Sequence, residues 1–364
     1  MRTGYMVINQ NAHQGLSDSE MVKSELRMAE LAEPLRFDTI WSAEHHFDDY
    51  SMVPDNFQLL TYLAARTRRI HLGTAAVILP WNDPLRVAEK AAMLDALSEG
   101  RFILGLGRGL ARMEYRAFGI DMSEARDRFN EAAKMVLEAL ENGFIEGKGP
   151  FYKQARTEIR PRPTRSFKGR LYAVAMSPES APIAADFAAR MMFFVQFAIE
   201  NHMPGVESYR EHYRKTQHAE APPVHAIDFT YCDRDAGRAE ETARKYITAY
   251  YLAVLRHYEF LEDYHAKIKG YEAYGNAAQL LREMGKDNAA EDFVQQQAWG
   301  TPQQILDKLE KRRRVLGDFE SNICASYAGL PFKDAEASVR LFAKEVLPEI
   351  RAWGRDEFEP VRAA

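Results

Sequence analysis

Short apolar runs alternate with amphipathic stretches along almost the whole chain. Segments typical of helices lie between the apolar runs, for example at 19–32, 84–97 and 126–142. Eight runs have the character of buried strands: 4–8, 39–44, 70–79, 102–107, 171–176, 191–197, 224–231 and 323–328. Near-continuous apolar strands separated by helices indicate a parallel sheet covered by helices. Eight such units in 364 residues favour a closed (β/α)8 barrel over an open doubly wound sheet.

The regular alternation offers no obvious linker, so we expect a single domain over residues 1–364. One connection is unusually long. Residues 236–297 exceed a single crossover helix and predict a helical insertion between the seventh and eighth strands. Because the loops that follow barrel strands carry function, this insertion is a candidate lid.

Composition narrows the class of protein. The formal charge of −5 gives no reason to expect nucleic acid or an anionic membrane as partner. The two cysteines, Cys232 and Cys324, offer no disulfide framework and suit a reducing compartment. Neither a signal peptide nor a membrane-spanning apolar stretch is recognisable, so we expect a cytoplasmic enzyme.

Two adjacent histidines, His45 and His46, close the second apolar run. Successive side chains of a strand point to opposite sides, so one imidazole can face a pocket while the other packs behind it. An imidazole that faces the pocket is suited to acid–base chemistry near neutral pH, although a purely structural pair is an equal alternative. A zinc site is less favoured, since no further closely spaced His or Cys accompanies the pair.

Two other segments predict an anion site. Arg108 follows the fourth strand in a glycine-rich stretch, and its guanidinium could bind a phosphate. Ser177 and Ser180 follow the fifth strand at the start of a helix, where hydroxyls and free amides favour anions. A plain turn and plain N-capping are the structural alternatives. Strands four and five are neighbours in a barrel, so the three side chains could hold one phosphate.

Small residues in the third strand, 73–80, leave room for a flat ligand, or else they pack in the layers of the barrel. An aromatic stretch in the insertion could line an apolar pocket, or else form a helix core. Its members are Tyr250, Tyr251, Tyr258, Phe260 and Tyr264.

Several of these motifs, in order and at matching spacing, resemble the bacterial luciferase family of flavin-dependent monooxygenases. They are WSAEHHF at 41–47, GTAAVILP at 73–80 and DALSEGRFILGLGRG at 95–109. The resemblance continues at 118–122, 300–302 and 322–324 and so spans nearly the whole chain.

The resemblance implies a barrel that binds reduced FMN, normally delivered by a separate flavin reductase. In this family reduced flavin reacts with O2 to give a C4a-(hydro)peroxide that oxygenates a small organic substrate, such as a carbonyl or aromatic compound. His45 would be the catalytic histidine beside the flavin. A non-prolyl cis peptide at Ala75-Ala76 would lie beneath the isoalloxazine. The remaining residues implied to bind the cofactor are Arg108, Leu110, Met176, Ser177 and Ser180.

The sequence departs from luciferase at three places. Met176 replaces an acidic residue before the first phosphate serine, and Gly107 replaces a reactive cysteine. The aldehyde-pocket residues after strand six are replaced by Phe193-Phe194-Val195-Gln196-Phe197. We therefore expect a non-luminescent oxygenase. Luciferase pairs two unlike chains, whereas we expect this chain to pair with itself as a homodimer.

Three other functions are considered. A deazaflavin-dependent hydride transfer uses the same barrel in related families, and a non-catalytic flavin-binding barrel is a second possibility. A metal-dependent hydrolase is the third, and we expect no metal. Within the insertion, Lys267-Ile268-Lys269-Gly270-Tyr271 resembles part of the mobile loop of luciferase, which supports the lid hypothesis.

Overall fold

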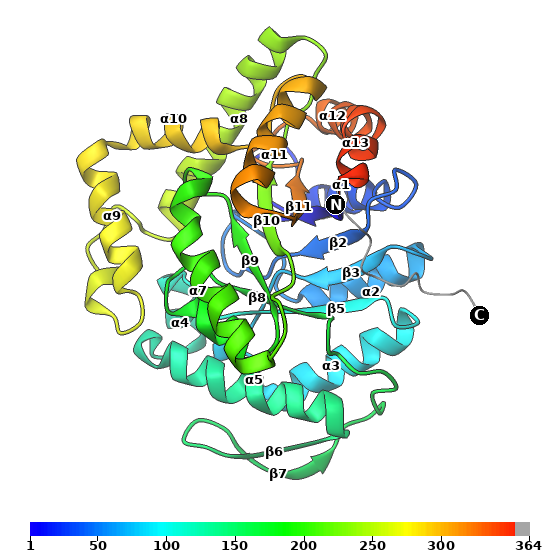
Figure 1. Cartoon of the computed structure of the whole chain (residues 1–364), viewed down its shortest axis with the longest axis vertical. Coiled ribbons are helices and arrows are strands. Elements are labelled where there is room, and N and C mark those ends of the chain that lie inside the picture. The colour runs from blue at the N-terminus through cyan, green and yellow to red at the C-terminus, as the bar shows by residue number, and fades with distance from the viewer. Residues whose placement is uncertain (354–364) are drawn as a thin grey trace.

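Eight parallel strands close into a barrel in the computed structural model, which describes residues 1–353 (Figure 1). Each strand pairs in parallel with the next in chain order, and β11 pairs with β1 to complete the circle. The barrel strands are β1 (Thr3–Val7), β2 (Thr39–Ser42), β3 (His71–Thr74), β5 (Phe102–Gly107), β8 (Leu171–Val174), β9 (Arg190–Phe194), β10 (Val224–Phe229) and β11 (Phe319–Cys324). The predicted (β/α)8 barrel is confirmed.

Helices surround the barrel, and several begin where the sequence supplies a cap. Ser17 with Glu20 and Thr301 with Gln304 form capping boxes. The longer helices are α1 (Asp18–Glu30), α2 (Asn56–Arg66), α3 (Pro84–Leu97), α5 (Ala125–Asn142), α7 (Ile199–Gln217), α8 (Ala236–His257), α9 (Glu272–Met284), α10 (Lys286–Gln296), α11 (Pro302–Leu316) and α12 (Phe332–Glu345). The shorter ones are α4 (Arg112–Phe118), α6 (Ser180–Asp186), α13 (Leu347–Ala352) and the 3-10 turns η1 (Leu79–Trp81), η2 (Met122–Glu124) and η3 (His265–Lys267). None of the helices within residues 1–353 combines the length and apolarity that crossing a membrane requires.

The strand predictions need three corrections. The last strand spans Phe319–Cys324, whereas the prediction was 323–328. The prediction began too late because the first half of the strand carries the polar residues Glu320, Ser321 and Asn322. The third run is interrupted after Thr74 and resumes as the two-residue strand β4 (Val77–Ile78). An antiparallel hairpin, β6 (Phe144–Lys148) and β7 (Lys153–Glu158), was not predicted, since most of its residues are polar and exposed.

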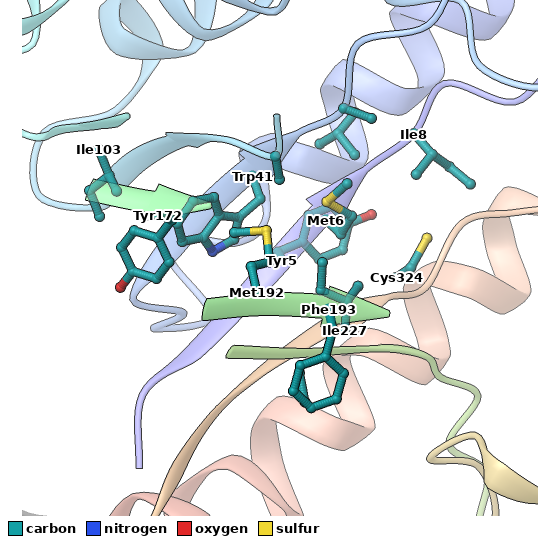
Figure 2. Packing of buried hydrophobic residues seen from close by; sticks show 14 of the residues in the cluster. Tyr5, Met6, Ile8, Trp41, Ile103, Tyr172, Met192, Phe193, Ile227 and Cys324 are labelled. Atoms are coloured by element: carbon teal, nitrogen blue, oxygen red, sulfur yellow. The ribbon is translucent and has the colours of Figure 1, made fainter. Parts of the chain in front are cut away.

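The barrel interior is filled by large side chains around Trp41 (Figure 2). The indole meets the ring of Tyr172 edge-on, at 4.8 Å between ring centroids. It lies over two strand glycines: a Cβ added to Gly4 or Gly73 would come within 2.6 or 2.3 Å of it. Trp41 therefore closes the lower part of the barrel and leaves the space for a ligand at the carboxyl ends of the strands.

Helices α8, α9 and α10 form the predicted insertion between β10 and β11 (Figure 1). Helix α10 packs against α8, and α9 extends to one side of the barrel. The last turn of α8 and the segment that leads to α9 reach the carboxyl ends of the strands, where His257 and Tyr258 meet residues that follow β2.

Candidate functional site

A cavity of about 310 Å³ opens at the carboxyl ends of the strands. Its wall combines barrel residues, among them His45, Ala75 and Met176, with side chains of the insertion. The lining is largely apolar and aromatic, and its rings are those of Tyr50, Phe194, Phe197, Phe229, Tyr250, Tyr251, Tyr258, Phe260, Tyr274 and Phe293. Four of the five aromatic residues singled out in the insertion thus line the cavity, whereas Tyr264 packs beneath the guanidinium of Arg112.

His45 lies in this wall with a partner on each ring nitrogen. Its Nδ1 is 3.1 Å from Oε1 of Glu114, and its Nε2 is 3.2 Å from the hydroxyl of Tyr258. The same Glu114 oxygen accepts the backbone amide of His46 at 2.7 Å. Burial alone would raise the pKa of Glu114, but the charge and hydrogen bond of His45, with the charge of His257 and the amide of His46, together hold that pKa below its usual value. An ionised Glu114 accepts a hydrogen bond from Nδ1–H, so Nε2 is the nitrogen that can exchange a proton in the cavity.

His46 points away from the cavity, as strand alternation predicts. Its Nε2 lies 3.3 Å from Oε1 of Glu44. That carboxylate also accepts the indole N–H of Trp81 and the amide of Asn82, both at 2.8 Å. His46 is therefore part of a buried structural network behind the strand.

Arg108, Ser177 and Ser180 come together near the cavity with a fourth residue, Arg126. The two serine hydroxyls are 2.8 Å apart, and Arg126 donates to Ser180 Oγ at 2.8 Å. Neither guanidinium forms an ion pair with any residue of the described range 1–353. Burial and, second, the charge of Arg108 lower the pKa of Arg126 to about 10. Glu179 is close enough to raise the pKa of Arg126 slightly but forms no ion pair with it. Two nearby cations that form no salt bridge within residues 1–353, beside two hydroxyls, form a donor set suited to a phosphate.

Plain N-capping does not account for the serines. The N-cap position of α6 is Glu179, and no side chain caps the helix. The hydroxyls of Ser177 and Ser180 bond to each other and to Arg126 instead. Arg126 was not singled out in the sequence, where nothing distinguishes it from the other charged residues at the start of α5.

The peptide bond between Ala75 and Ala76 is cis, as the resemblance implies. Asn56 donates its side-chain amide to the Ala76 carbonyl at 3.1 Å. Gly107 lies close by, and a Cβ there would come within 2.9 Å of Ile78 and 3.1 Å of the Ala76 Cβ. A larger side chain at 107 would crowd this wall, which accounts for the glycine in place of a cysteine. Leu110 packs beside Tyr115 and Tyr271, outside the cavity lining.

The profile of luciferase-like monooxygenases matches residues 1–318. The chain belongs to this family. It is 27% identical over 344 residues to the alkanal monooxygenase alpha chain of Photorhabdus luminescens. This alignment covers 92% of this chain and 94% of the relative.

Solved structures share the fold. Monooxygenase RslO1 from Streptomyces bottropensis has a TM-score of 0.76 at 25% identity, covering 96% of this chain and all of that one. The oxygenating constituent of 3,6-diketocamphane monooxygenase from Pseudomonas putida, solved in complex with FMN, has a TM-score of 0.75 at 14% identity and covers 96% and 98%. An F420-dependent secondary alcohol dehydrogenase shares the fold at a TM-score of 0.70 and 16% identity, covering 95% and 98%.

In this luciferase-like monooxygenase the insertion reaches directly into the arginine site. Arg108 donates to the carbonyl of Gly270 at 2.6 Å, and its guanidinium lies 3.8 Å above the ring of Tyr271. Both lysines of the segment lie at the surface: Lys267 pairs with Asp263 and Lys269 with Asp127. From the sequence, only one of the two lysines was expected at the surface, and which of them could not be predicted.

Proposed function

We propose that this luciferase-like monooxygenase is a non-luminescent enzyme that uses reduced FMN and O2 to oxygenate a small apolar organic substrate. The observation that carries the proposal is the joining of the Arg108, Arg126, Ser177 and Ser180 cluster to an apolar cavity that contains His45. When bound, reduced FMN supplies the electrons that activate O2, and the protein supplies orientation, exclusion of water and proton control.

The donor set fits a flavin phosphate. Arg108 and Arg126 would neutralise the phosphate, and Ser177 and Ser180 would donate hydroxyl hydrogens to it. Arg108 now donates one N–H to Gly270. A guanidinium has five donors, so it can bind a phosphate and retain this contact. Ala75 in the cavity wall and the Ala75-Ala76 peptide would lie against the isoalloxazine.

His45 would accept and donate a proton at Nε2. Glu114 accepts the Nδ1 hydrogen and so fixes the tautomer in which Nε2 is free to accept. Tyr258 is the nearest hydroxyl, at 3.2 Å, and can donate to Nε2 or return a proton to it. The aromatic wall would exclude water, which in this chemistry prevents loss of reducing equivalents as hydrogen peroxide.

The lining indicates the substrate class. The lining contains His45 but no aspartate, glutamate, lysine or arginine, and most of its surface is aliphatic or aromatic. An uncharged carbonyl or aromatic compound suits such a wall, because an ionised substrate would lose its hydration without gaining a partner.

A deazaflavin-dependent hydride transfer is the second candidate function, favoured by the shared fold of the F420-dependent alcohol dehydrogenase. A non-catalytic flavin-binding protein is the third. Titration with FMN, riboflavin and a deazaflavin separates these candidates, since the two cofactor types differ in absorption spectrum. Substrate-dependent O2 uptake separates catalysis from binding.

The test of the phosphate assignment compares reduced FMN with riboflavin under anaerobic conditions. FMN should bind more tightly, and Arg108→Ala should weaken FMN by about 1.5–3 kcal/mol, the range for hydrogen bonds to charged groups. Arg126→Ala should act in the same direction, while riboflavin affinity stays unchanged in both. Lys134→Ala, an exposed cation on the same helix as Arg126, is the matched control. Equal affinity of the unaltered protein for FMN and riboflavin would refute the assignment.

We further propose that a separate flavin reductase supplies the reduced FMN, by diffusion of the cofactor. Coupled assays with an unrelated reductase should then support full turnover. A requirement for one specific reductase at equal concentrations of reduced FMN would contradict delivery by diffusion.

A further inference from the structure

A second imidazole lies behind His45 and was not expected from the sequence. His257 is the last residue of α8, and its side chain is completely buried. Its Nδ1 is 3.1 Å from Oδ2 of Asp48, and its Nε2 is 3.9 Å from Oε1 of Glu114. The ring meets that of His45 edge-on, at 5.0 Å between centroids. Two carboxylates and two imidazoles thus alternate in one line that ends at the cavity.

Both ring nitrogens of His257 face carboxylates, and this arrangement favours a proton on each of them. Asp48 accepts the Nδ1 hydrogen, so in the neutral tautomer Nε2 of His257 would present a lone pair to the Glu114 carboxylate. Two acceptors facing each other in a buried place repel, whereas one proton between them makes the contact attractive. Nε2 has no hydrogen-bond partner within residues 1–353. Tyr50, which stacks on the ring, directs its hydroxyl to Tyr250 instead.

We propose that His257 carries a second proton, at Nε2, and forms an ion pair with the ionised Glu114, and that His257 is thereby a positioning residue for His45. At 3.9 Å the contact between Nε2 and Oε1 is an ion pair and is too long for a hydrogen bond, so the proton stays on Nε2. Its presence keeps Glu114 in place as the acceptor for His45 Nδ1. The effect on turnover rests on the proposed function, but the location of the proton does not.

The surroundings leave this proton exchangeable. The groups that face His257 are His45, Asp48 and Tyr50 from the segment after β2, Glu114 on α4, and Tyr258 directly after α8. Burial and the charge of His45 lower the pKa of His257 below its usual value, and Asp48 and Glu114 offset that effect only in part. The charge of His257 in turn contributes to the lowered pKa of Glu114. The proton at Nε2 is therefore one that His257 can lose as the pH rises.

The test that does not depend on activity is nitrogen NMR of histidine-labelled, flavin-free protein, with His257 assigned by the signals lost in His257→Gln. Its Nδ1 should be protonated throughout pH 5–9, and Nε2 should lose a proton within that range. Glu114→Gln should shift this titration by about one pH unit or more, since it removes a charge at close range. His202, a partly buried histidine with no acidic partner among residues 1–353, is the internal control and should stay neutral, because burial lowers its pKa to about 4.

A titration of His257 that is absent, or identical in Glu114→Gln, would overturn the proposal. So would stoichiometric Zn²⁺ or another metal in the purified protein, because the ligand atoms of His45, Glu114 and His257 lie within 4.8 Å of one another. Elemental analysis of the same sample decides this point.

The second test is the pH profile of coupled turnover. Without His257 the pKa of Glu114 rises, so His45 loses its acceptor at a higher pH and the acid limb should move upward by roughly half a unit or more. Asp48→Asn should move it in the same direction, and His212→Gln, which removes an exposed imidazole–aspartate pair, should leave it in place. A lower rate at every pH with an unchanged limb would mean that His257 is merely structural. Failure of all variants and the unaltered protein to turn over would count against the proposed function alone.

Discussion

The two adjacent histidines have different neighbours, and this difference separates their expected roles. His45 joins Glu114 to the cavity, whereas His46 joins Glu44 to a network of buried amides. We expect His45→Ala to retain FMN binding but to lower product formation by about 10² or more, the usual range for a general acid or base. Oxygen consumption should continue and release hydrogen peroxide. His46→Gln is the control, and it should reduce stability more than coupling. An unchanged ratio of product to oxygen in His45→Ala would remove His45 from the mechanism.

Gly105 lies on β5 at a point where the backbone of Thr74 on β3 approaches it closely. A Cβ there would lie 1.9 Å from the carbonyl oxygen of Thr74, a backbone atom that cannot move aside. Thr74 also exchanges two hydrogen bonds with the Gly105 backbone, at 2.8 and 2.9 Å. Gly105→Ala should therefore destabilise the protein by about 1–3 kcal/mol or more in urea unfolding. Gly205→Ala, on helix α7 with no atom nearer than 3.7 Å, should instead stabilise by about 0.5–1 kcal/mol. Equal stability of the two variants would contradict the strand contact.

At the scale of elements, the insertion is tied to the barrel through Arg108. Tyr271 is fully buried, and its hydroxyl donates to the Gly109 carbonyl at 2.8 Å. The segment therefore covers the same guanidinium that we assign to phosphate, so bound FMN and a closed insertion would reinforce each other. This contact is the structural basis for the lid hypothesis.

Limited proteolysis tests the lid. Cleavage within 258–292 should be rapid without ligand and several-fold slower with FMN and substrate both bound. The exposed turn of the β6–β7 hairpin is the control, since its cleavage should not depend on ligand. Deletion of 267–276 should leave the barrel folded but increase hydrogen peroxide release, although it removes the buried ring of Tyr271. Wild-type coupling in the deletion variant would show that the segment is no lid.

The elements were more predictable than the contacts between them. Most barrel strands could be predicted because buried parallel strands are apolar on both faces. The start of β11 was missed because its first half is polar, and the exposed β6–β7 hairpin has no apolar signal. Glu114 and Tyr258 stand 69 and 213 residues from His45, so only the closed barrel brings them together. His257 lies in the aromatic stretch that the sequence analysis singled out. Its contact with Asp48 could not be predicted, because the two residues are 209 positions apart in the sequence. Residue-level chemistry therefore depended on the resemblance to luciferase.

At the scale of the whole molecule, we propose that two copies pair through the neighbouring helices α2 and α3. Their outer faces expose Tyr62, Met93 and Leu97, each close to half exposed, on two helices that pack side by side. Light scattering should give about twice the chain mass of 41.6 kDa. Met93→Glu with Leu97→Glu should give monomers, while Leu280→Glu on α9 should not. A monomer at tens of micromolar would contradict the pairing.

The stability of the whole chain should depend on pH through buried groups of two kinds. Burial lowers the pKa of His71, His202 and His265 to about 4 each, against 6.5 for a free imidazole. Their contribution is present above pH 6.5 and is lost as the pH falls towards 4. Glu25 acts in the opposite direction, since burial raises its pKa to about 7. Its contribution is complete below pH 4.5 and is lost as the pH rises to 7.

Because three histidines oppose one carboxyl, the free energy of unfolding should fall between pH 7 and pH 5. Glu25→Gln removes the opposing group, so its stability should fall more steeply over the same interval, by up to a few kcal/mol since one pKa unit corresponds to about 1.4 kcal/mol. His202→Leu, which replaces an imidazole stacked on Phe193 by an apolar side chain, should make the fall shallower. Urea unfolding at pH 5, 6 and 7 measures the free energy of unfolding of the unaltered protein, Glu25→Gln and His202→Leu. A stability that is constant from pH 7 to 5, or a Glu25→Gln slope equal to that of the unaltered protein, would show that these groups do not titrate as their burial requires.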